Sequence, residues 1–232
     1  MARRVYETIS IDAKEINVSR VMEKTEPRPM ANDLYISVPD NYSATVYLDG
    51  EPVKKLKPCA RKKLKKFVGS DKVGKQVSVL YINKRQLTTM SWGIGNLPIK
   101  YDFLDGMCIK VGANGTFIAT MTDPEAFFEF CGARNGSLSL TETVSRITSA
   151  FREHASLILT GLFKEAIEPV FDTEFMLAEM DRRINSVICE KELKNIPGII
   201  FKTSTVTGIC VCEEDIRAYR ERFINSRHAV RK

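Results

Sequence analysis

Apolar and polar residues alternate along much of the chain between residues 31 and 135, and this period of two is typical of half-buried β-strands. The alternating stretches are DLYISVP, SATVYLDGEPV, KVGKQVSVLYIN, KRQLTTMSWG, GMCIKVGA and GTFIATMT. The pairs Asp49-Gly50 and Asn114-Gly115 separate apolar runs and are two-residue turn signals, so each predicts a β-hairpin. This part of the chain is therefore expected to be rich in strands.

Helix signals begin where the alternation ends. A short, buried helix over AFFEF is expected to start at Pro124, because Thr122 or Asp123 can cap it and proline suits the first turn. A capping-box pattern from Ser139 to Glu142 then precedes apolar residues at helical spacing. These residues are Leu140, Val144, Ile147, Phe151, Ile158 and Leu162.

The rest of the chain is predicted to contain two more helices with a pair of strands between them. After a break near Glu168-Pro169, a helix over residues 173–194, capped by Asp172 or Thr173, is expected to stop at Pro197-Gly198. Its apolar face consists of Leu177, Met180, Ile184 and Val187. IIFKTSTVTGICV is β-rich and predicts the strand pair, and EEDIRAYRERFINSR predicts a final amphipathic helix that docks on its own sheet or on a neighbouring subunit. The apolar stripe of that helix is Ile216, Tyr219, Arg220, Phe223 and Ile224.

The order of these elements predicts an α+β fold, because the strands come first and the helices are grouped after them. Three parts are expected along the chain. They are an N-terminal arm over residues 1–30, which closes in the Pro-containing EKTEPRPM, a domain over residues 31–212, and a C-terminal helix with a basic tail over residues 213–232.

Composition narrows the class of protein. The chain has 232 residues, of which 44% are hydrophobic, so it can bury a sizeable core as one large or two small domains. It has no apolar run of about 18 residues, so no transmembrane helix is expected. Its six cysteines form no C-x-x-C pair, which favours a reduced, cytoplasmic compartment and argues against a zinc site.

The stretch GSDKVGKQ, from Gly69 to Gln76, fits the beginning of the P-loop pattern. A P-loop joins a buried strand to a helix, and a hydroxyl residue after its lysine holds Mg²⁺. Here the preceding residues are basic, the following ones are strand-like, and Gln76 replaces the hydroxyl residue. We therefore expect a turn between a basic loop and a strand, and no nucleotide cofactor.

Few residues can support catalysis. Only two histidines occur, and nothing couples His154, in a predicted helix, or His228, in the charged tail, to a nucleophile. Cys210 and Cys212 share a face of the predicted strand, which is open to a redox or metal pair, although two small core residues are favoured. We expect no catalytic, cofactor-binding or metal-binding residues, and hence no enzyme.

The positive charge of the chain, +6 in total, is concentrated in residues 54–75. This stretch contains ten lysines and arginines against the single acid Asp71, a local charge of +9. It could keep a strand edge soluble, contact an anionic membrane surface, or contact nucleic-acid phosphates. Nucleic acid is the least favoured partner, because only Phe67 is available to stack on bases. The candidate anionic-surface contacts are Lys54, Lys55, Lys57, Arg61, Lys62, Lys63, Lys65 and Lys66.

Two motifs resemble a known family. GTFIATMTDPEAF is similar to the strand and helix start of SPFH (band 7) domains, the family of stomatin, prohibitin and flotillin. MSWGIGNLPIKYDF resembles a segment of the bacterial branch described as virion core protein-like, although Ile94 and Gly95 stand where that branch has Thr-Pro. The resemblance covers about residues 32–215. The matching residues that we treat as a structural motif are Trp92, Gly93, Gly115, Thr116, Asp123, Pro124 and Phe127.

The resemblance implies an SPFH-like domain with a curved, mostly antiparallel sheet and without catalytic residues. It implies a scaffold that self-associates and acts at a membrane surface or with a membrane-associated protein. The expected location is the cytoplasm, including the inner face of the membrane. Nucleic-acid binding through residues 54–75 is the alternative, and no small-molecule substrate is expected. The family's membrane hairpin, long coiled coil and zinc ribbon have no counterpart in this sequence.

Overall fold

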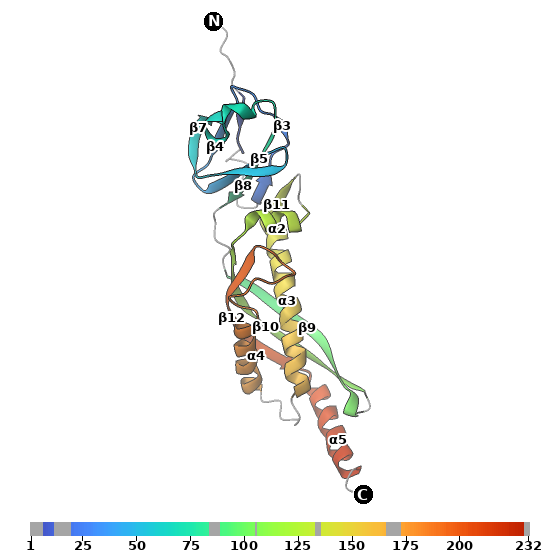
Figure 1. The fold of residues 1–232 in the computed structure, drawn as a ribbon. Coiled ribbons are helices and arrows are strands. Elements are labelled where there is room, and N and C mark those ends of the chain that lie inside the picture. Colours follow the sequence, from blue (N-terminus) through green and yellow to red (C-terminus); the bar gives the residue numbers. More distant parts are fainter. Residues whose placement is uncertain are drawn as a thin grey trace. The chain divides into compact units, whose positions relative to one another are not determined.

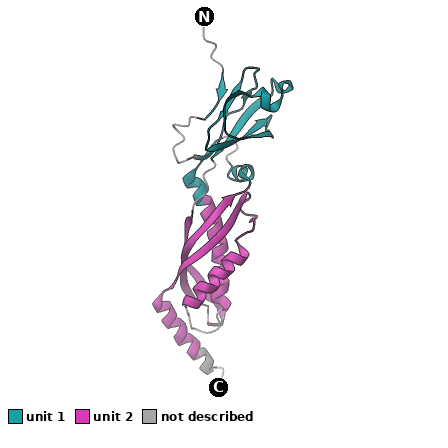
Figure 2. Cartoon of the chain, turned by 90° about the vertical axis from the view of Figure 1, so that its left-hand side faces the viewer, with its two compact units in different colours: residues 1–86, 123–145 teal, residues 87–122, 146–232 magenta. Residues whose placement is uncertain are grey.

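The computed structural model describes residues 7–11, 20–83, 89–104, 106–132, 136–165 and 173–229. These residues form β-strands, α-helices and two short 3₁₀ helices, and most strand pairs are antiparallel, so the predicted α+β class is confirmed (Figure 1). Contacts divide the chain into two compact units. Unit 1 comprises residues 1–86 and 123–145, and unit 2 comprises residues 87–122 and 146–232 (Figure 2).

Unit 1 contains two sheets. The smaller sheet has the order β1 (Thr8–Ile9), β4 (Tyr35–Val38), β7 (Cys59–Lys63). The larger sheet has the order β11 (Ser137–Ser139), β2 (Arg20–Lys24), β8 (Gln76–Asn83), β5 (Tyr42–Leu48), β6 (Glu51–Leu56), with β3 (Arg28–Pro29) also paired to β8. Strands β2 and β3 come from the predicted N-terminal arm, so that part of the arm belongs to the sheet.

One hydrophobic cluster contains residues of both sheets. Ile36 of β4, Val46 of β5 and Val79 of β8 are fully buried members of it. The Tyr81 hydroxyl lies 3.1 Å from the carbonyl oxygens of Ile9 and Ser37, so this buried polar group has hydrogen-bond partners. Burial raises the pKa of Tyr81. The alternating patterns of these strands thus bury their apolar side chains in a common core.

Two local predictions in unit 1 are confirmed. Asp49 and Gly50 connect β5 to β6 with φ angles of 52° and 89°, as a tight hairpin turn requires. Helix α2 (Pro124–Phe130) begins at the predicted proline, and the Asp123 side chain accepts a hydrogen bond of 3.1 Å from the Ala126 amide. Both signals act between residues close in sequence, which explains why the pattern found them.

Unit 2 is built on a three-stranded antiparallel sheet. Its order is β12 (Ile199–Val211), β10 (Met107–Met121), β9 (Met90–Tyr101), and η2 (Asp102–Leu104) follows β9. Helix α3 (Leu140–Glu165) begins in unit 1 and belongs to unit 2 from Arg146 onward. Its Phe151 ring lies 5.5, 4.4 and 5.2 Å, between centroids, from the rings of Trp92, Phe117 and Phe201. One aromatic side chain of α3 therefore contacts all three strands.

The predicted turn at Asn114-Gly115 is wrong. Both residues lie inside β10, where Gly115 pairs with Trp92 of β9 and with Val206 of β12. The register with β12 shifts between Asn114 and Gly115, as in a β-bulge. A Cβ at position 115 would meet the Thr205 carbonyl oxygen and lie 2.9 Å from Trp92 Nε1. Glycine is needed here for the close approach of two strands, and not for a turn.

The predicted start of α3 is confirmed and its apolar face is confirmed in part. The Glu142 amide donates to Ser139 Oγ at 3.1 Å, and the Ser139 amide donates to the Glu142 carboxylate at 3.0 Å, which completes the capping box. Of the predicted face, Ile147, Phe151 and Leu162 are buried, whereas Leu140 is exposed.

Helix α4 (Thr173–Val187) is shorter than predicted. It ends at Val187, ahead of Pro197-Gly198, and Glu190 in the following turn has a φ of 60°. Of its predicted apolar face, Met180 and Ile184 are buried and Val187 is exposed. Met176, which was not part of that predicted face, is also buried. The predicted break at Glu168-Pro169 and the cap at Asp172 lie outside the described residues.

Helix α5 (Glu213–Ala229) agrees with its prediction, whereas the predicted pair of strands is one continuous strand, β12, which pairs with β10. Of the predicted stripe on α5, Tyr219 and Phe223 are buried, whereas Ile224 is exposed. The Tyr219 ring packs on that of Tyr101 of β9, with centroids 4.9 Å apart. This helix therefore docks on its own unit.

Side chains of α4 cover the outer edge of β12. The Asn185 amide donates to the Ser204 carbonyl oxygen and accepts from the Ser204 amide, both at 3.0 Å. Asp181 Oδ1 accepts a hydrogen bond of 2.8 Å from the Val206 amide. The helix thereby satisfies main-chain groups that a neighbouring strand would otherwise bond.

Candidate anionic-surface site

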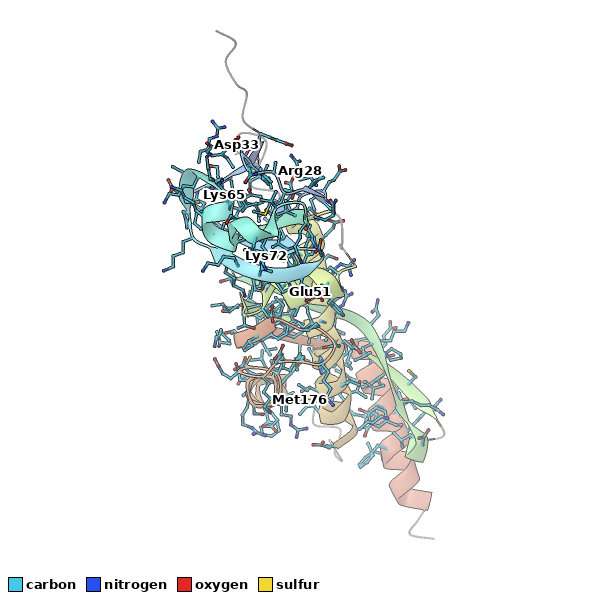
Figure 3. The ribbon with its side chains drawn as sticks, turned by 45° about the horizontal axis from the view of Figure 1, so that its top comes forward. Arg28, Asp33, Glu51, Lys65, Lys72 and Met176 are labelled. Carbon is cyan, nitrogen blue, oxygen red and sulfur yellow. The ribbon has the colours of Figure 1, made fainter. Side chains whose placement is uncertain are left out.

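Seven of the eight candidate contacts lie on two edge strands and a short helix of unit 1, and Lys57 lies in the connection between the two strands. Lys54 and Lys55 are on β6, Lys57 follows it, Arg61, Lys62 and Lys63 are on β7, and Lys65 and Lys66 are on α1 (Lys65–Val68). Each strand has a partner on one side only, because β6 ends the larger sheet and β7 ends the smaller one. Figure 3 labels Lys65 and, on η1 (Ser70–Lys72), Lys72.

Four lysines of the basic stretch form ion pairs. They are Lys55 with Glu125 at 3.2 Å, Lys63 with Asp33 at 2.9 Å, Lys72 with Asp71 at 2.6 Å and Lys75 with Asp49 at 3.0 Å. Two hydrogen bonds lower the pKa of Asp49, and the bond from Lys75 has a larger effect than the bond from the Gln76 amide. Three of these carboxylates, all but Asp71, come from outside the stretch, so they reduce its local charge from +9 to +6.

The other basic residues of the stretch differ in the partners of their side chains. Lys65 donates to the Asn32 side-chain oxygen at 3.5 Å, a neutral partner. Arg61 lies over the Tyr35 ring, 4.4 Å from its centroid. Within the described ranges, four lysines form neither an ion pair nor a side-chain hydrogen bond, and we call them the unpaired lysines: Lys54, Lys57, Lys62 and Lys66. All four are exposed.

The unpaired lysines present compact positive charges on flexible side chains. A lysine ammonium group sits on a flexible stem and attracts anions without the fixed fork of an arginine. The unpaired lysines therefore suit a surface that carries many negative charges, such as lipid head groups or a phosphate backbone. They are less suited to holding one small anion in a fixed orientation.

The GSDKVGKQ stretch has no P-loop context. The one-turn helix α1 precedes Gly69, whose φ is 96°, and η1 leads to β8, which begins at Gln76. A strand therefore follows the lysine where a P-loop has a helix. The predicted turn before a strand is confirmed, while the basic segment ahead of it is β7 and α1 and not a loop.

The residues considered for catalysis are dispersed. His154 is half-buried, its Nε2 lies 3.2 Å from Asn195 Oδ1, and Asn195 donates to Glu153 at 3.1 Å. These bonds connect α3 to the segment before β12, which favours a structural role for His154. Cys210 and Cys212 are exposed, so their predicted place in a core is wrong. Among the described residues, no group of three His, Cys, Asp or Glu could hold a metal ion.

A groove of about 400 Å³ lies on unit 2. Strand β9 and helix α3 line it through Gly93, Ile94, Gly95, Leu97, Ser149, Arg152, Glu153 and Ser156. No pattern in the sequence predicted this groove. Its one local signal is the spacing of two glycines in the β9 sequence WGIG, and the helical wall comes from residues far along the chain.

The motif residues fall in both units. Trp92 and Gly115 are cross-strand partners on β9 and β10, and Gly93 and Thr116 are their neighbours. Asp123 caps α2, which starts at Pro124 and buries Phe127, so these three residues belong to unit 1. Strand β10 ends at Met121 and α2 starts at Pro124, which confirms the predicted passage from strand to helix.

No protein-family model matches the chain, and no curated protein matches it either. The SPFH relationship thus stays a prediction. Of the helices that the structure describes, none is both long enough and apolar enough to cross a membrane.

Proposed function

We propose that this protein is a non-enzymatic, self-associating scaffold of SPFH-like type that binds an anionic membrane surface through unit 1. The observation that carries the proposal is the set of unpaired lysines on β6, β7, α1 and their connections. A lysine near an anionic leaflet contributes about 1 kcal/mol, so four together contribute up to about 4 kcal/mol. That amount suits reversible attachment to a surface.

Exposed apolar side chains support self-association. Leu157 on α3 is 66% exposed and Ile224 on α5 is 53% exposed, both in unit 2. Covering large exposed apolar side chains with a second surface lowers the free energy of the system. Copies of the chain at one membrane surface would meet at a higher local concentration, which favours such contacts.

Vesicle binding tests the role of the unpaired lysines. The test variant replaces Lys54, Lys57, Lys62 and Lys66 with Gln, and the matched control replaces Lys100, Lys164, Lys194 and Arg222 of unit 2 with Gln. Both variants lose the same net charge at exposed positions. In co-sedimentation with vesicles containing about one third phosphatidylserine, we expect the test variant to bind at least tenfold more weakly than the control.

RNA binding by the wild-type chain and vesicle binding by the same variants distinguish the membrane proposal from its alternatives. If the wild-type chain binds single-stranded RNA with a steep salt dependence and does not sediment with vesicles, nucleic-acid binding replaces the membrane proposal. Equal vesicle binding by the test variant and the control would leave these lysines as solubilising groups on two strand edges.

A further inference from the structure

The outer edge of β9 is less protected than the edges formed by β6 and β12. Proteins protect edge strands with charge, proline or a covering element. Strand β6 carries Pro52, Lys54 and Lys55, and α4 covers β12. From Met90 to Gly95, β9 has no charge and no proline, and no described element is hydrogen-bonded to its outer side.

The groove follows this edge. The register passes from Ile94 opposite Ala113 to Leu97 opposite Val111, so Gly95 and Asn96 together face Gly112 in a bulge. A bulge leaves an extra residue outside the ladder. At Gly93 and Gly95 a Cβ would meet nothing within 4 Å, so the space beside the main chain is open. Another main chain can therefore approach β9 closely here.

The helical wall of the groove carries two opposite charges, those of Arg152 and Glu153, and they differ in their partners. Arg152 has no carboxylate partner among the described residues. The neighbouring Glu153 carboxylate accepts a hydrogen bond of 3.1 Å from the Asn195 side chain. Arginine binds carboxylates through paired, charge-assisted hydrogen bonds. The chemical complement of Arg152, the one of the two without a side-chain partner among the described residues, is thus a carboxylate.

We propose that β9 and α3 form a binding groove for an extended peptide segment with an acidic side chain. The segment adds as a strand to β9 between Met90 and Gly95, which spans about 20 Å, through main-chain hydrogen bonds. Its carboxylate pairs with Arg152 on the facing helix. The groove shares no residue with the unpaired lysines, so this proposal and the membrane proposal can fail separately.

Fluorescence anisotropy with the full chain tests the groove. The probe is a short, capped peptide of alternating threonine and valine with one central glutamate, and the comparison peptide carries lysine there. We expect the wild-type chain to prefer the glutamate peptide by at least about tenfold, and Arg152→Glu to invert that preference. Lys164→Glu, an exposed charge reversal on the same helix outside the groove, should leave the preference unchanged.

A second peptide series tests the strand pairing. Methylation of alternate main-chain nitrogens removes hydrogen-bond donors and leaves the glutamate in place. We expect the methylated glutamate peptide to lose at least about tenfold in affinity. The proposal is overturned if methylation has no effect, if Arg152→Glu behaves like Lys164→Glu, or if no peptide binds. If Gly93→Glu dissociates a dimer of a chain that binds no peptide, the occupant of the edge is a second copy.

Discussion

Gly115 has no room for a side chain, because the neighbouring strands approach its main chain closely. Replacing it with alanine would push Cβ against the Thr205 carbonyl oxygen and the Trp92 indole. We expect Gly115→Ala to lower the free energy of unfolding by about 3 kcal/mol, measured by urea denaturation. Gly93→Ala is the matched control on β9, where a Cβ meets nothing within 4 Å, and should change it by less than about 0.5 kcal/mol.

Cys189 differs from the exposed cysteines of unit 2 in its reactivity. Burial, with smaller effects of Glu190 and Asp181, raises the pKa of its thiol to about 11. At pH 8 only about one thiol in a thousand is then the reactive thiolate. We expect iodoacetamide at pH 8 to modify Cys108, Cys210 and Cys212 first, as mass spectrometry of peptides would show. Equal labelling of Cys189 in the folded chain would contradict its burial.

Among the elements, α4 and β12 are joined by two hydrogen bonds of the Asn185 amide in addition to the one accepted by Asp181. Removing the Asn185 side chain leaves the Ser204 amide and carbonyl without these partners, and such a loss costs about 1–3 kcal/mol. We expect Asn185→Ala to lower the midpoint of urea unfolding and to raise light scattering, because it also uncovers a strand edge. Ser186→Ala, at the exposed next position, is the control and should do neither.

Helix α4 also carries a set of charges that responds to acid. Hydrogen bonds from Arg182 and then Arg183 lower the pKa of Glu179 to about 2, and Arg183 also bonds Glu165 of α3 at 2.7 Å. Because the pKa is lower in the folded chain, these bonds stabilise the fold above the usual value of 4.5 and are lost as the pH falls toward 2.

Thermal unfolding between pH 6 and pH 2.5 tests this assignment. We expect Glu179→Gln to lower the midpoint at pH 6 and to make its decrease toward pH 2.5 shallower than in the wild-type chain. Glu221→Gln, an exposed carboxylate on α5, serves as the control and should follow the wild-type curve. A parallel curve for Glu179→Gln would show that other carboxylates dominate the acid response.

For the whole molecule, the scaffold proposal predicts self-association. We expect light scattering to give a mass above the 26.2 kDa of one chain, and anionic vesicles to shift the distribution upward. Leu157→Ser with Ile224→Ser should reduce the mass, because it removes exposed apolar surface from unit 2. Val53→Ser with Val73→Ser provides the control in unit 1. One-chain mass at every concentration, with or without vesicles, would refute the scaffold proposal.

Prediction from the pattern succeeded where neighbours in sequence decide the structure. The Asp49-Gly50 hairpin, the Asp123 cap and the capping box at Ser139 were found because their hydrogen bonds or backbone angles involve residues at most a few positions apart. The same type of signal failed at Asn114-Gly115. There, pairing with β9 and β12 on both sides keeps the chain extended and overrides the turn preference of the two residues.

In the basic stretch, too, the sequence predicted local properties and did not predict contacts with distant residues. Its lysines and their concentration were evident from the sequence, but the partners were not. Lys55 meets Glu125, and Lys63 meets Asp33, only because strands and helices bring distant segments together. The pattern therefore predicted eight equivalent contacts, and the structure separates the unpaired lysines from those already neutralised.

The sequence by itself determined the α+β class, most element types and the local charge, because these depend on composition and on short-range spacing. Tertiary structure decided how the chain is shared between two discontinuous units, which lysines lack carboxylates, and which sheet edge stays open. Each of these properties depends on contacts between residues far apart in the chain. No periodicity encodes such contacts, since they arise only when strands pair and helices pack against them.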